Sequence, residues 1–452
     1  MTTAFKDFEA QVEFTPECDP LSELANAHRL VKKYGKRLRH SPSLGWLYYD
    51  GTRWAPGEKM VRRWAAKVGG MLRAESGQIK NDDVAKAYRS AGRRAESSRG
   101  IESTMKIAAV LEPIDATNIE FDAHPWLLNC SNCEVDLQTG KELKHDPEHY
   151  HTKICKTAYK PGAKRKDWID HLMVVFGDDK TMVDYFQFLA GYALTASMKH
   201  QLFVIVHGKG GRGKSTTVEA LARVIGDDYG TAISHDVVLD TRNTGHACTT
   251  AALRGVRFGL LAELPPGARW NEAAIKRLSA GNSITARYIG CNPFTFQSTV
   301  KMFADCNERP EFRDQSGGME RRIRCVPFEV QLSDTDQCNR NIDAELDAEA
   351  EGILAWAVEG AVIAHDREPT VPERVRLSSA EYARENDALA EFLATCCVVD
   401  AQAQATKSAA FEAYQNWGGP LKKRQFGKLL ETRFDEYSDG KSRYWIGFRL
   451  TS

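Results

Sequence analysis

The sequence predicts an α/β protein with a mixed helical domain before the central sheet and a small domain after it. The run LFVIVHG, residues 202–208, is apolar, ends in glycine and is followed by the helix-like VEALARVIG. A strand, a glycine loop and a helix in this order are typical of the start of an α/β sheet. The further apolar runs VRFGLLAE, TVKMFADCN and RRIRCVPFEV predict the remaining strands.

Length and local patterns predict three domains, at residues 1–165, 166–370 and 371–452, because the chain has 452 residues and domains average roughly 150. In the first, Met60, Val61, Trp64 and Val68 recur at helical spacing, and GWLYYDGTRW predicts a hairpin turning at Asp50 and Gly51. Helical patterns between residues 168 and 200 precede the sheet. The segment EPTVPERV, with its two prolines, predicts a linker before the last domain.

The composition is that of an ordinary globular protein, with 42% hydrophobic and 27% charged residues. Lys plus Arg and Asp plus Glu both number 61, which excludes a globally basic histone-like binder and an acidic disordered tail. Any contact with nucleic acid must therefore come from local basic patches. No apolar run approaches the roughly 20 residues that span a bilayer, and the N-terminus lacks a signal-peptide core. We therefore expect a cytoplasmic protein with no membrane partner, whose 11 cysteines are free thiols.

The segment GKGGRGKS, Gly208 to Ser215, fits the P-loop pattern G-x4-G-K-[ST]. About 0.015 chance matches are expected in a chain of this length and composition. Its glycines let backbone N–H groups turn toward phosphate oxygens. Lys214 then reaches the β- and γ-phosphates and the Ser215 hydroxyl ligates Mg²⁺. The motif predicts binding of ATP or another nucleoside triphosphate through Gly208, Lys209, Gly210, Gly211, Arg212, Gly213, Lys214, Ser215 and Thr216.

Hydrolysis needs further polar groups at the ends of neighbouring strands. Glu263 ends the apolar run 258–262 and is the candidate for holding Mg²⁺ or activating water. Asn307 follows the strand predicted at 300–303 and is the candidate for holding the lytic water. Arg321 and Arg322 precede the last strand, where an arginine finger for a neighbouring subunit would lie. Asp305 is an additional charge to which the sequence assigns no role.

Taken together, these residues resemble the superfamily 3 AAA+ helicases, and most closely the helicase part of phage, plasmid and poxvirus primase–helicases. The resemblance rests on FVIVHGKGGRGKST, GLLAELPPGARWNEAAIKRLSAGNSITARYIGCNPFTF, VKMFADCNERP and MERRIRCVPFEV, in this order. It continues upstream in HPWLLNCSNCEVDLQTGKELKHDP and covers the chain from about residue 20 to 328. It implies an AAA+ P-loop ATPase core preceded by a collar-like helicase-associated domain. It also implies a hexameric ring that uses ATP and Mg²⁺ and moves 3′ to 5′ on one DNA strand.

The resemblance also assigns roles to single residues. Lys214 and Ser215 serve phosphate and metal, Glu263 is the acidic residue of the second motif, and Asn307 is the polar sensor. Arg321 or Arg322 is the finger in trans. The segment 284–296 corresponds to the hairpin that lines the channel, where we expect DNA contacts from Arg287 and Tyr288, with Lys276 and Arg277 nearby. Two features depart from the family: Arg212 replaces a small amide, and only one acidic residue ends the second strand.

Many relatives carry a primase domain ahead of this module. Here the helicase-like region begins within about 20 residues of Met1, too few for a catalytic primase fold. We therefore expect a helicase without primase activity, with a separate primase or polymerase as a possible partner.

The last domain combines a basic helix with an aromatic hairpin. Phe426, Leu429, Leu430 and Phe434 lie on one face of a helix predicted at 422–434, and SDGKSRYWIGFRL predicts a hairpin after it. This pattern favours a winged-helix-like DNA-binding domain, although a basic packing helix is the alternative. The candidate DNA-binding residues are Lys422, Lys423, Arg424 and Lys428.

Cys130, Cys133, His145 and His149 have nearly the spacing of a zinc finger. The gap between the two pairs is one residue short, and a turn at 137–140 replaces the expected helix. The resemblance to the helicase family implies strand, turn and strand here, without a metal.

The leading hypothesis is an ATP-driven DNA helicase of phage, satellite or plasmid replication, acting on single-stranded and forked DNA. Three alternatives stay open: a non-unwinding remodelling ATPase or loader, an origin-binding assembly protein with weak ATPase activity, and a P-loop small-molecule kinase. Strand displacement on forked DNA separates the helicase from the non-unwinding ATPase, and Glu263→Gln separates the assembly protein from an ATPase.

Overall fold

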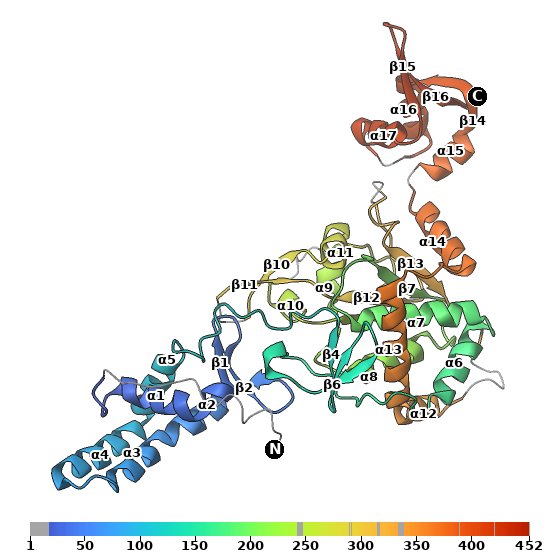
Figure 1. The fold of residues 1–452 in the computed structure, drawn as a ribbon. Coiled ribbons are helices and arrows are strands. Elements are labelled where there is room, and N and C mark those ends of the chain that lie inside the picture. The colour runs from blue at the N-terminus through green and yellow to red at the C-terminus, as the bar shows by residue number, and fades with distance from the viewer. Residues whose placement is uncertain are drawn as a thin grey trace. The chain divides into compact units, whose positions relative to one another are not determined.

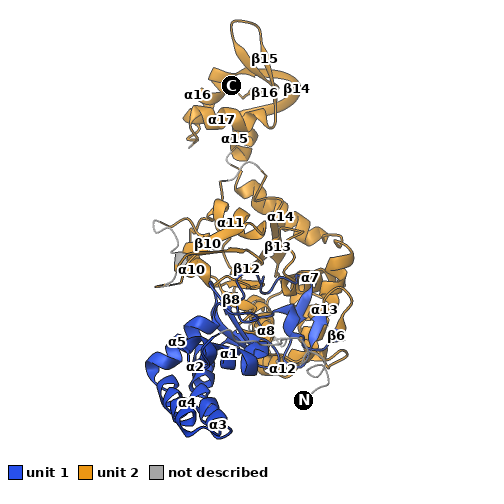
Figure 2. Cartoon of the chain, turned by 60° about the vertical axis from the view of Figure 1, so that its left-hand side comes forward, with its two compact units in different colours: residues 1–135, 142–154 blue, residues 136–141, 155–452 orange. Residues whose placement is uncertain are grey.

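The protein is described here from a computed structural model, in residues 18–241, 247–288, 290, 292–313, 317–332, 339–387, 389–419 and 421–451. The chain divides into two units, coloured separately in Figure 2: residues 1–135 with 142–154, and residues 136–141 with 155–452. The second unit contains both segments that the sequence separates at residue 371. None of the described helices is both long and apolar enough to cross a membrane.

In the described residues of the first unit, helices α1 to α5 pack beside a small antiparallel sheet of order β1-β2-β3. Ser22 caps the first helix by accepting a hydrogen bond from the Ala25 N–H (3.1 Å). The predicted hairpin is also present, and Asp50 closes its turn by accepting from the Thr52 and Arg53 N–H groups. The elements are α1 (Glu23–Tyr34), α2 (Glu58–Ala66), α3 (Val68–Ser76), α4 (Asp82–Ala95), α5 (Ser98–Ala108), β1 (Leu38–Ser41), β2 (Gly45–Tyr49) and β3 (Trp54–Pro56).

A second small sheet surrounds the turn predicted at residues 137–140. Its strands are β4 (Leu127–Asn129), β5 (Glu134–Asp136) and β6 (Lys141–Leu143), in this order. The turn is held by the Asp136 carboxylate, which accepts from the Gln138 N–H and the Thr139 hydroxyl. Strand, turn and strand therefore occur as the sequence predicts.

A five-stranded parallel sheet of order β13-β7-β12-β9-β8 forms the core of the second unit (Figure 1). Its strands are β7 (Phe203–His207), β8 (Gly230–Ala232), β9 (Phe258–Leu261), β12 (Lys301–Cys306) and β13 (Ile323–Pro327). The first strand of the predicted α/β unit, β7, lies between β13 and β12. Because the strands are parallel, the loops after β7, β9 and β12 leave the same edge of the sheet.

Helices pack against this sheet and against one another. α13 contacts both α7 and α8, and α14 contacts β13. A hairpin of β10 (Ser283–Ala286) and β11 (Phe294–Gln297) occurs where the sequence predicts one at 284–296. The helices are α6 (Lys166–Phe176), α7 (Lys180–Leu194), α8 (Lys214–Ile225), α9 (His235–Val238), α10 (Ala247–Ala251), α11 (Glu272–Ser279), α12 (Ile342–Ala348), α13 (Ala350–Asp366) and α14 (Glu373–Glu385).

The C-terminal segment has its own apolar cluster, which includes Phe392, Tyr414, Phe426, Leu430 and Trp445. Its elements in chain order are α15 (Ala390–Cys396), β14 (Cys397–Thr406), α16 (Lys407–Asn416), α17 (Lys423–Glu431), β15 (Asp435–Ser438) and β16 (Arg443–Leu450). The strands form an antiparallel sheet of order β14-β16-β15. The predicted helix is therefore present but ends at Glu431, three residues early, and the predicted hairpin follows it.

Candidate functional site: a phosphate-binding loop

The loop from residue 208 to 213 joins β7 to α8, and its geometry requires glycine. Gly213 precedes α8 with φ at 78°, in the left-handed region. A Cβ at Gly213 would lie 2.7 Å from the Val175 Cγ1, and one at Gly208 would lie 2.2 Å from the Phe328 oxygen. These two positions tolerate no side chain, so the fold itself needs glycine at both.

A cavity of about 470 Å³ opens over the loop. It is lined by Gly210, Gly211, Arg212, Gly213, Lys214, Ser215, Thr216, Glu263, Leu264, Pro266, Asp305, Cys306, Asn307 and Glu308. The predicted phosphate, acidic and sensor residues therefore share one pocket. Gly208 lines an adjacent cavity of about 360 Å³, and the Lys209 carbonyl contacts Lys214.

Lys214 is 5% exposed and its ammonium is held by three groups around the pocket. Its Nζ donates to the Lys209 oxygen (3.1 Å) and to Asn307 Oδ1 (2.9 Å), and it lies 4.0 Å from Asp305 Oδ1. Burial lowers the pKa of Lys214, and the nearby Asp305 carboxylate opposes that shift. Lys214 and Asn307, predicted from separate motifs, are thus brought into direct contact.

The sequence assigned no role to Asp305, yet its side chain is in contact with the loop. The sequence indicated that the strand becomes polar after Phe303, whereas β12 continues to Cys306 with every residue buried. Asp305 is 9% exposed and its Oδ2 accepts a hydrogen bond of 2.5 Å from the Ser215 hydroxyl. A carboxylate in a strand that is apolar apart from Lys301 was the available signal.

Glu263 lies after β9, on the cavity wall and exposed. Its φ of 52° is left-handed, a conformation that costs a non-glycine residue roughly 1–2 kcal/mol. In the sheet, β12 lies between β9, which precedes Glu263, and β7, which precedes the loop. Backbone strain of this kind is concentrated at functional sites.

The two candidate finger arginines differ in environment. Arg322 is 5% exposed, and its guanidinium donates to Ser279 Oγ, the Gly318 oxygen and Gln201 Oε1, at 2.7 to 3.1 Å. Arg321 is exposed, and no hydrogen bond or ion pair of its guanidinium is found among the described residues. Of the two, only Arg321 presents its charge to solvent.

The candidate DNA-binding residues lie at the surface in two places. Arg287 and Tyr288 follow β10, both exposed, and the Tyr288 ring stacks on Phe294 at 5.1 Å between centroids. Lys276 and Arg277 form the last turn of α11. In the C-terminal segment, the candidate basic residues at the start and in the last turn of α17 are exposed while Phe426 and Leu430 are buried. These exposed residues are Lys422, Lys423, Arg424 and Lys428.

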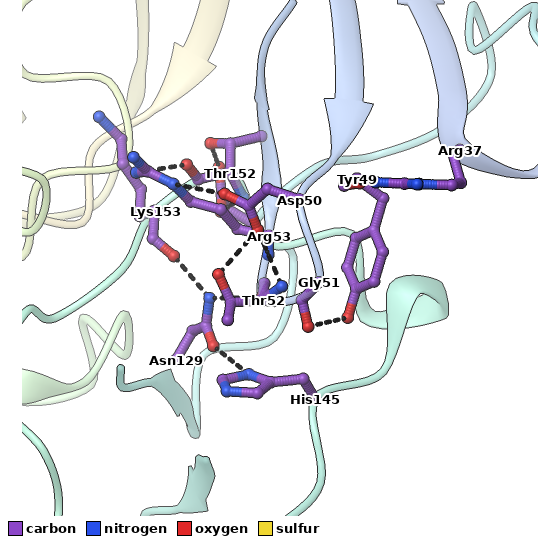
Figure 3. A network of polar contacts seen from close by, with 11 residues as sticks. Arg37, Tyr49, Asp50, Gly51, Thr52, Arg53, Asn129, His145, Thr152 and Lys153 are labelled. Carbon is purple, nitrogen blue, oxygen red and sulfur yellow. Dashed lines mark hydrogen bonds and ion pairs between the residues drawn. The ribbon is translucent and has the colours of Figure 1, made fainter. Parts of the chain in front are cut away.

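No three of the four residues with zinc-finger-like spacing form a group with ligand atoms within 4.8 Å of one another in the described part of the chain. His145 Nδ1 lies 3.0 Å from Asn129 Oδ1, inside the polar network of Figure 3. In the described part of the chain, the grouping with possible ligand atoms close together is Glu134, His149 and His151 instead. There the buried Glu134 carboxylate accepts from His149 Nδ1 (2.5 Å) and from the Asp146 N–H (2.9 Å).

Two histidines beside the loop predict a pH dependence of stability. Burial lowers the pKa of His171 to about 4, and its Nε2 lies 2.9 Å from the Thr217 hydroxyl, which donates to the Gly213 oxygen. Burial also lowers the pKa of His207 to about 4. Below pH 6.5 these histidines become protonated in the unfolded chain, whereas in the folded chain they stay neutral down to about pH 4. The free energy of unfolding therefore falls as the pH drops from about 6.5 to 4.

We expect His171 alone to lower the free energy of unfolding by roughly 2 kcal/mol between pH 7 and pH 5. Urea unfolding of the wild-type protein and of His171→Gln at both pH values measures this, and the variant should show a smaller loss. Equal losses in wild type and His171→Gln would contradict the assignment.

Two regions of the chain match known protein families. Residues 27–177 match the family described as "D5 N terminal like", and residues 206–322 match a family of unknown function, DUF5906. The second region contains the loop from residue 208 to 213, Glu263, Asn307 and both arginines.

Among curated proteins, similar sequences occur in large DNA viruses. A "Putative helicase" of Acanthamoeba polyphaga mimivirus is 28% identical over 33% of this chain and 16% of its own length. A "Putative primase" of African swine fever virus is 24% identical over 50% of this chain and 24% of its own. A "Putative helicase" of Invertebrate iridescent virus 6 is 24% identical over 60% and 29%. The chain thus spans less than a third of the length of each of these relatives.

A solved structure of the NrS-1 C-terminal region in its apo form aligns with 65% of this chain and 78% of its own, with a TM-score of 0.41 and 13% identity.

Proposed function

We propose that this chain is an ATP-driven DNA helicase of replication, of the superfamily 3 AAA+ type. The proposal rests on one observation: Lys214, Ser215 and Asn307 line one pocket, and Glu263 lies on its wall. Within it, Lys214 donates a hydrogen bond to Asn307. The helicase- and primase-named viral relatives support a role in replication.

The residues of the pocket fit ATP with Mg²⁺. The loop N–H groups and the start of α8 favour phosphate. The Ser215 hydroxyl, hydrogen-bonded to the Asp305 carboxylate, is an oxygen ligand of the kind Mg²⁺ prefers. The cavity of about 470 Å³ is within the range of small-molecule sites. When bound, magnesium supplies charge neutralisation at the β- and γ-phosphate oxygens.

The chain's own groups then divide the work of hydrolysis. Lys214 exchanges its contacts with Asn307 and the Lys209 oxygen for phosphate oxygens. Asn307, released by that exchange, orients water at the γ-phosphate, and Glu263 accepts its proton. Arg321, exposed ahead of β13, supplies a positive charge to the nucleotide of a neighbouring subunit in a hexameric ring.

Two surfaces of the chain bind DNA. The β10–β11 hairpin presents Arg287 for phosphate and Tyr288 for base stacking, which suits sequence-independent binding of a single strand. The C-terminal order of helix, strand, two helices and two strands supports a winged-helix-like domain with α17 as its DNA-facing helix. Movement from 3′ to 5′ is the polarity we expect.

The first test is ATP hydrolysis with and without single-stranded DNA, in wild type and Lys214→Ala. We expect DNA to stimulate wild-type turnover, and the variant to lose about 100-fold or more because the lysine stabilises the transferred charge. Strand displacement on forked DNA follows as the direct assay. Hydrolysis indifferent to DNA would favour a loader, and absence of hydrolysis would favour an origin-binding assembly protein.

A further inference from the structure

The end of β9 offers an incomplete set of groups for a magnesium site. In P-loop NTPases the ion is held by the P-loop Ser or Thr and by an aspartate at the end of another strand. After β9 this chain has Ala262, which carries no ligand atom, and then Glu263. Glu263 is exposed and left-handed, and no hydrogen bond between its side chain and Ser215 is found among the described residues. The carboxylate that orients the P-loop hydroxyl must therefore come from elsewhere.

Asp305 fills this place from the neighbouring strand. β12 pairs with β7 directly, with Asp305 opposite Val206, so its side chain is brought beside the loop that follows β7. Its Oδ2 accepts a hydrogen bond from the Ser215 hydroxyl, with 2.5 Å between the two oxygens, and its Oδ1 lies 4.0 Å from Lys214 Nζ. At 9% exposure, a carboxylate is costly to bury unless such partners satisfy it.

The direction of this hydrogen bond matters for the metal. A serine hydroxyl has one proton and two lone pairs. Because the Ser215 hydroxyl donates its hydrogen bond to Asp305, the lone pairs of its oxygen remain available to a cation in the cavity. Carboxylates that orient a ligand in this way typically change metal affinity 10- to 100-fold when they are removed.

We propose that Asp305, on β12, is the carboxylate that positions Ser215 for magnesium, in place of an aspartate on β9. This inference rests on the proposed nucleotide-binding function and refines it. It leaves Glu263 free to act on the attacking water alone. Asp305 is a positioning residue, since it acts through Ser215.

The test is a titration of Mg²⁺ into the 452-residue chain bound to a fluorescent ATP analogue, with binding in EDTA as the reference. We expect Asp305→Asn to raise the Mg²⁺ concentration for half-maximal effect by about 10- to 100-fold, with affinity in EDTA kept or increased. Ser215→Ala should cause a similar shift, and the double variant no further one, because both changes remove the same unit. Asp305→Ser serves as the second variant should the asparagine protein fail to fold.

Two control variants make the outcome specific. Glu311→Gln removes a carboxylate on the segment after β12 that pairs with Arg269 at 3.0 Å, and Glu263→Gln removes the carboxylate after β9. Neither should move the Mg²⁺ requirement. An unchanged requirement in Asp305→Asn, or an equal shift in Glu263→Gln, would overturn the inference. If wild type bound no nucleotide in either condition, the proposed function itself would fail, and this inference with it.

Discussion

Replacing Arg321 by alanine is expected to lower the ATP turnover number by about 10³- to 10⁵-fold, the effect of removing an arginine finger. Nucleotide affinity and thermal stability should change little, because the Arg321 side chain is exposed and makes no hydrogen bond or ion pair found in the described part of the chain. Steady-state hydrolysis, equilibrium nucleotide binding and thermal melting measure the three quantities separately.

The neighbouring arginine is the matched control. Arg322→Ala leaves Gln201, Ser279 and the Gly318 oxygen without their buried donor, at roughly 1–3 kcal/mol for each group that stays unsatisfied. We therefore expect this variant to lose stability. The reverse pattern, a stable but inactive Arg322→Ala beside an active Arg321→Ala, would exchange their roles.

Mixing two inactive proteins tests whether Arg321 acts between subunits. Arg321→Ala keeps an intact loop, and Lys214→Ala keeps an intact arginine, so a mixed ring contains some sites with both groups. Hydrolysis should reappear on mixing and peak at intermediate ratios. A mixture as inactive as its components, in a preparation shown to form mixed rings, would mean that the arginine serves its own subunit.

The sequence predicted the parts of the site that follow from short-range patterns. The loop from Gly208 to Ser215 was identifiable because glycine, lysine and serine at fixed spacing serve one chemical task. Glu263 and Asn307 were predicted because polar groups at the ends of parallel strands meet at one edge of the sheet. The structure places both on the wall of the pocket that the loop forms.

Sequence reasoning failed where the outcome depends on strand pairing and side-chain direction. Asp305 had no assignable role until β12 was seen to lie directly beside β7, with the carboxylate turned to Ser215. Arg321 and Arg322 are adjacent in sequence, and only burial separates them. His149 was considered with two cysteines, whereas the fold places it against Glu134 from a neighbouring segment.

Glu263→Gln is expected to lower turnover by about 10²- to 10⁴-fold, the usual contribution of a general base, while nucleotide and DNA binding are kept. The amide has the shape of the carboxylate but cannot accept a proton from water. Burst kinetics and filter binding to single-stranded DNA measure these effects. Loss of DNA binding together with turnover would indicate a structural role for Glu263.

A second substitution separates the chemistry of Glu263 from its backbone strain. Glycine adopts a φ of 52° freely, so Glu263→Gly recovers roughly 1–2 kcal/mol of left-handed strain. The substitution also lowers the free energy of unfolding by roughly 0.4–1 kcal/mol, because glycine gives the unfolded chain more conformational freedom. The glycine variant should therefore be at least as stable as wild type and as inactive as Glu263→Gln. Such a result would mean that the protein keeps a strained residue after β9 because the carboxylate must stand at that point of the pocket.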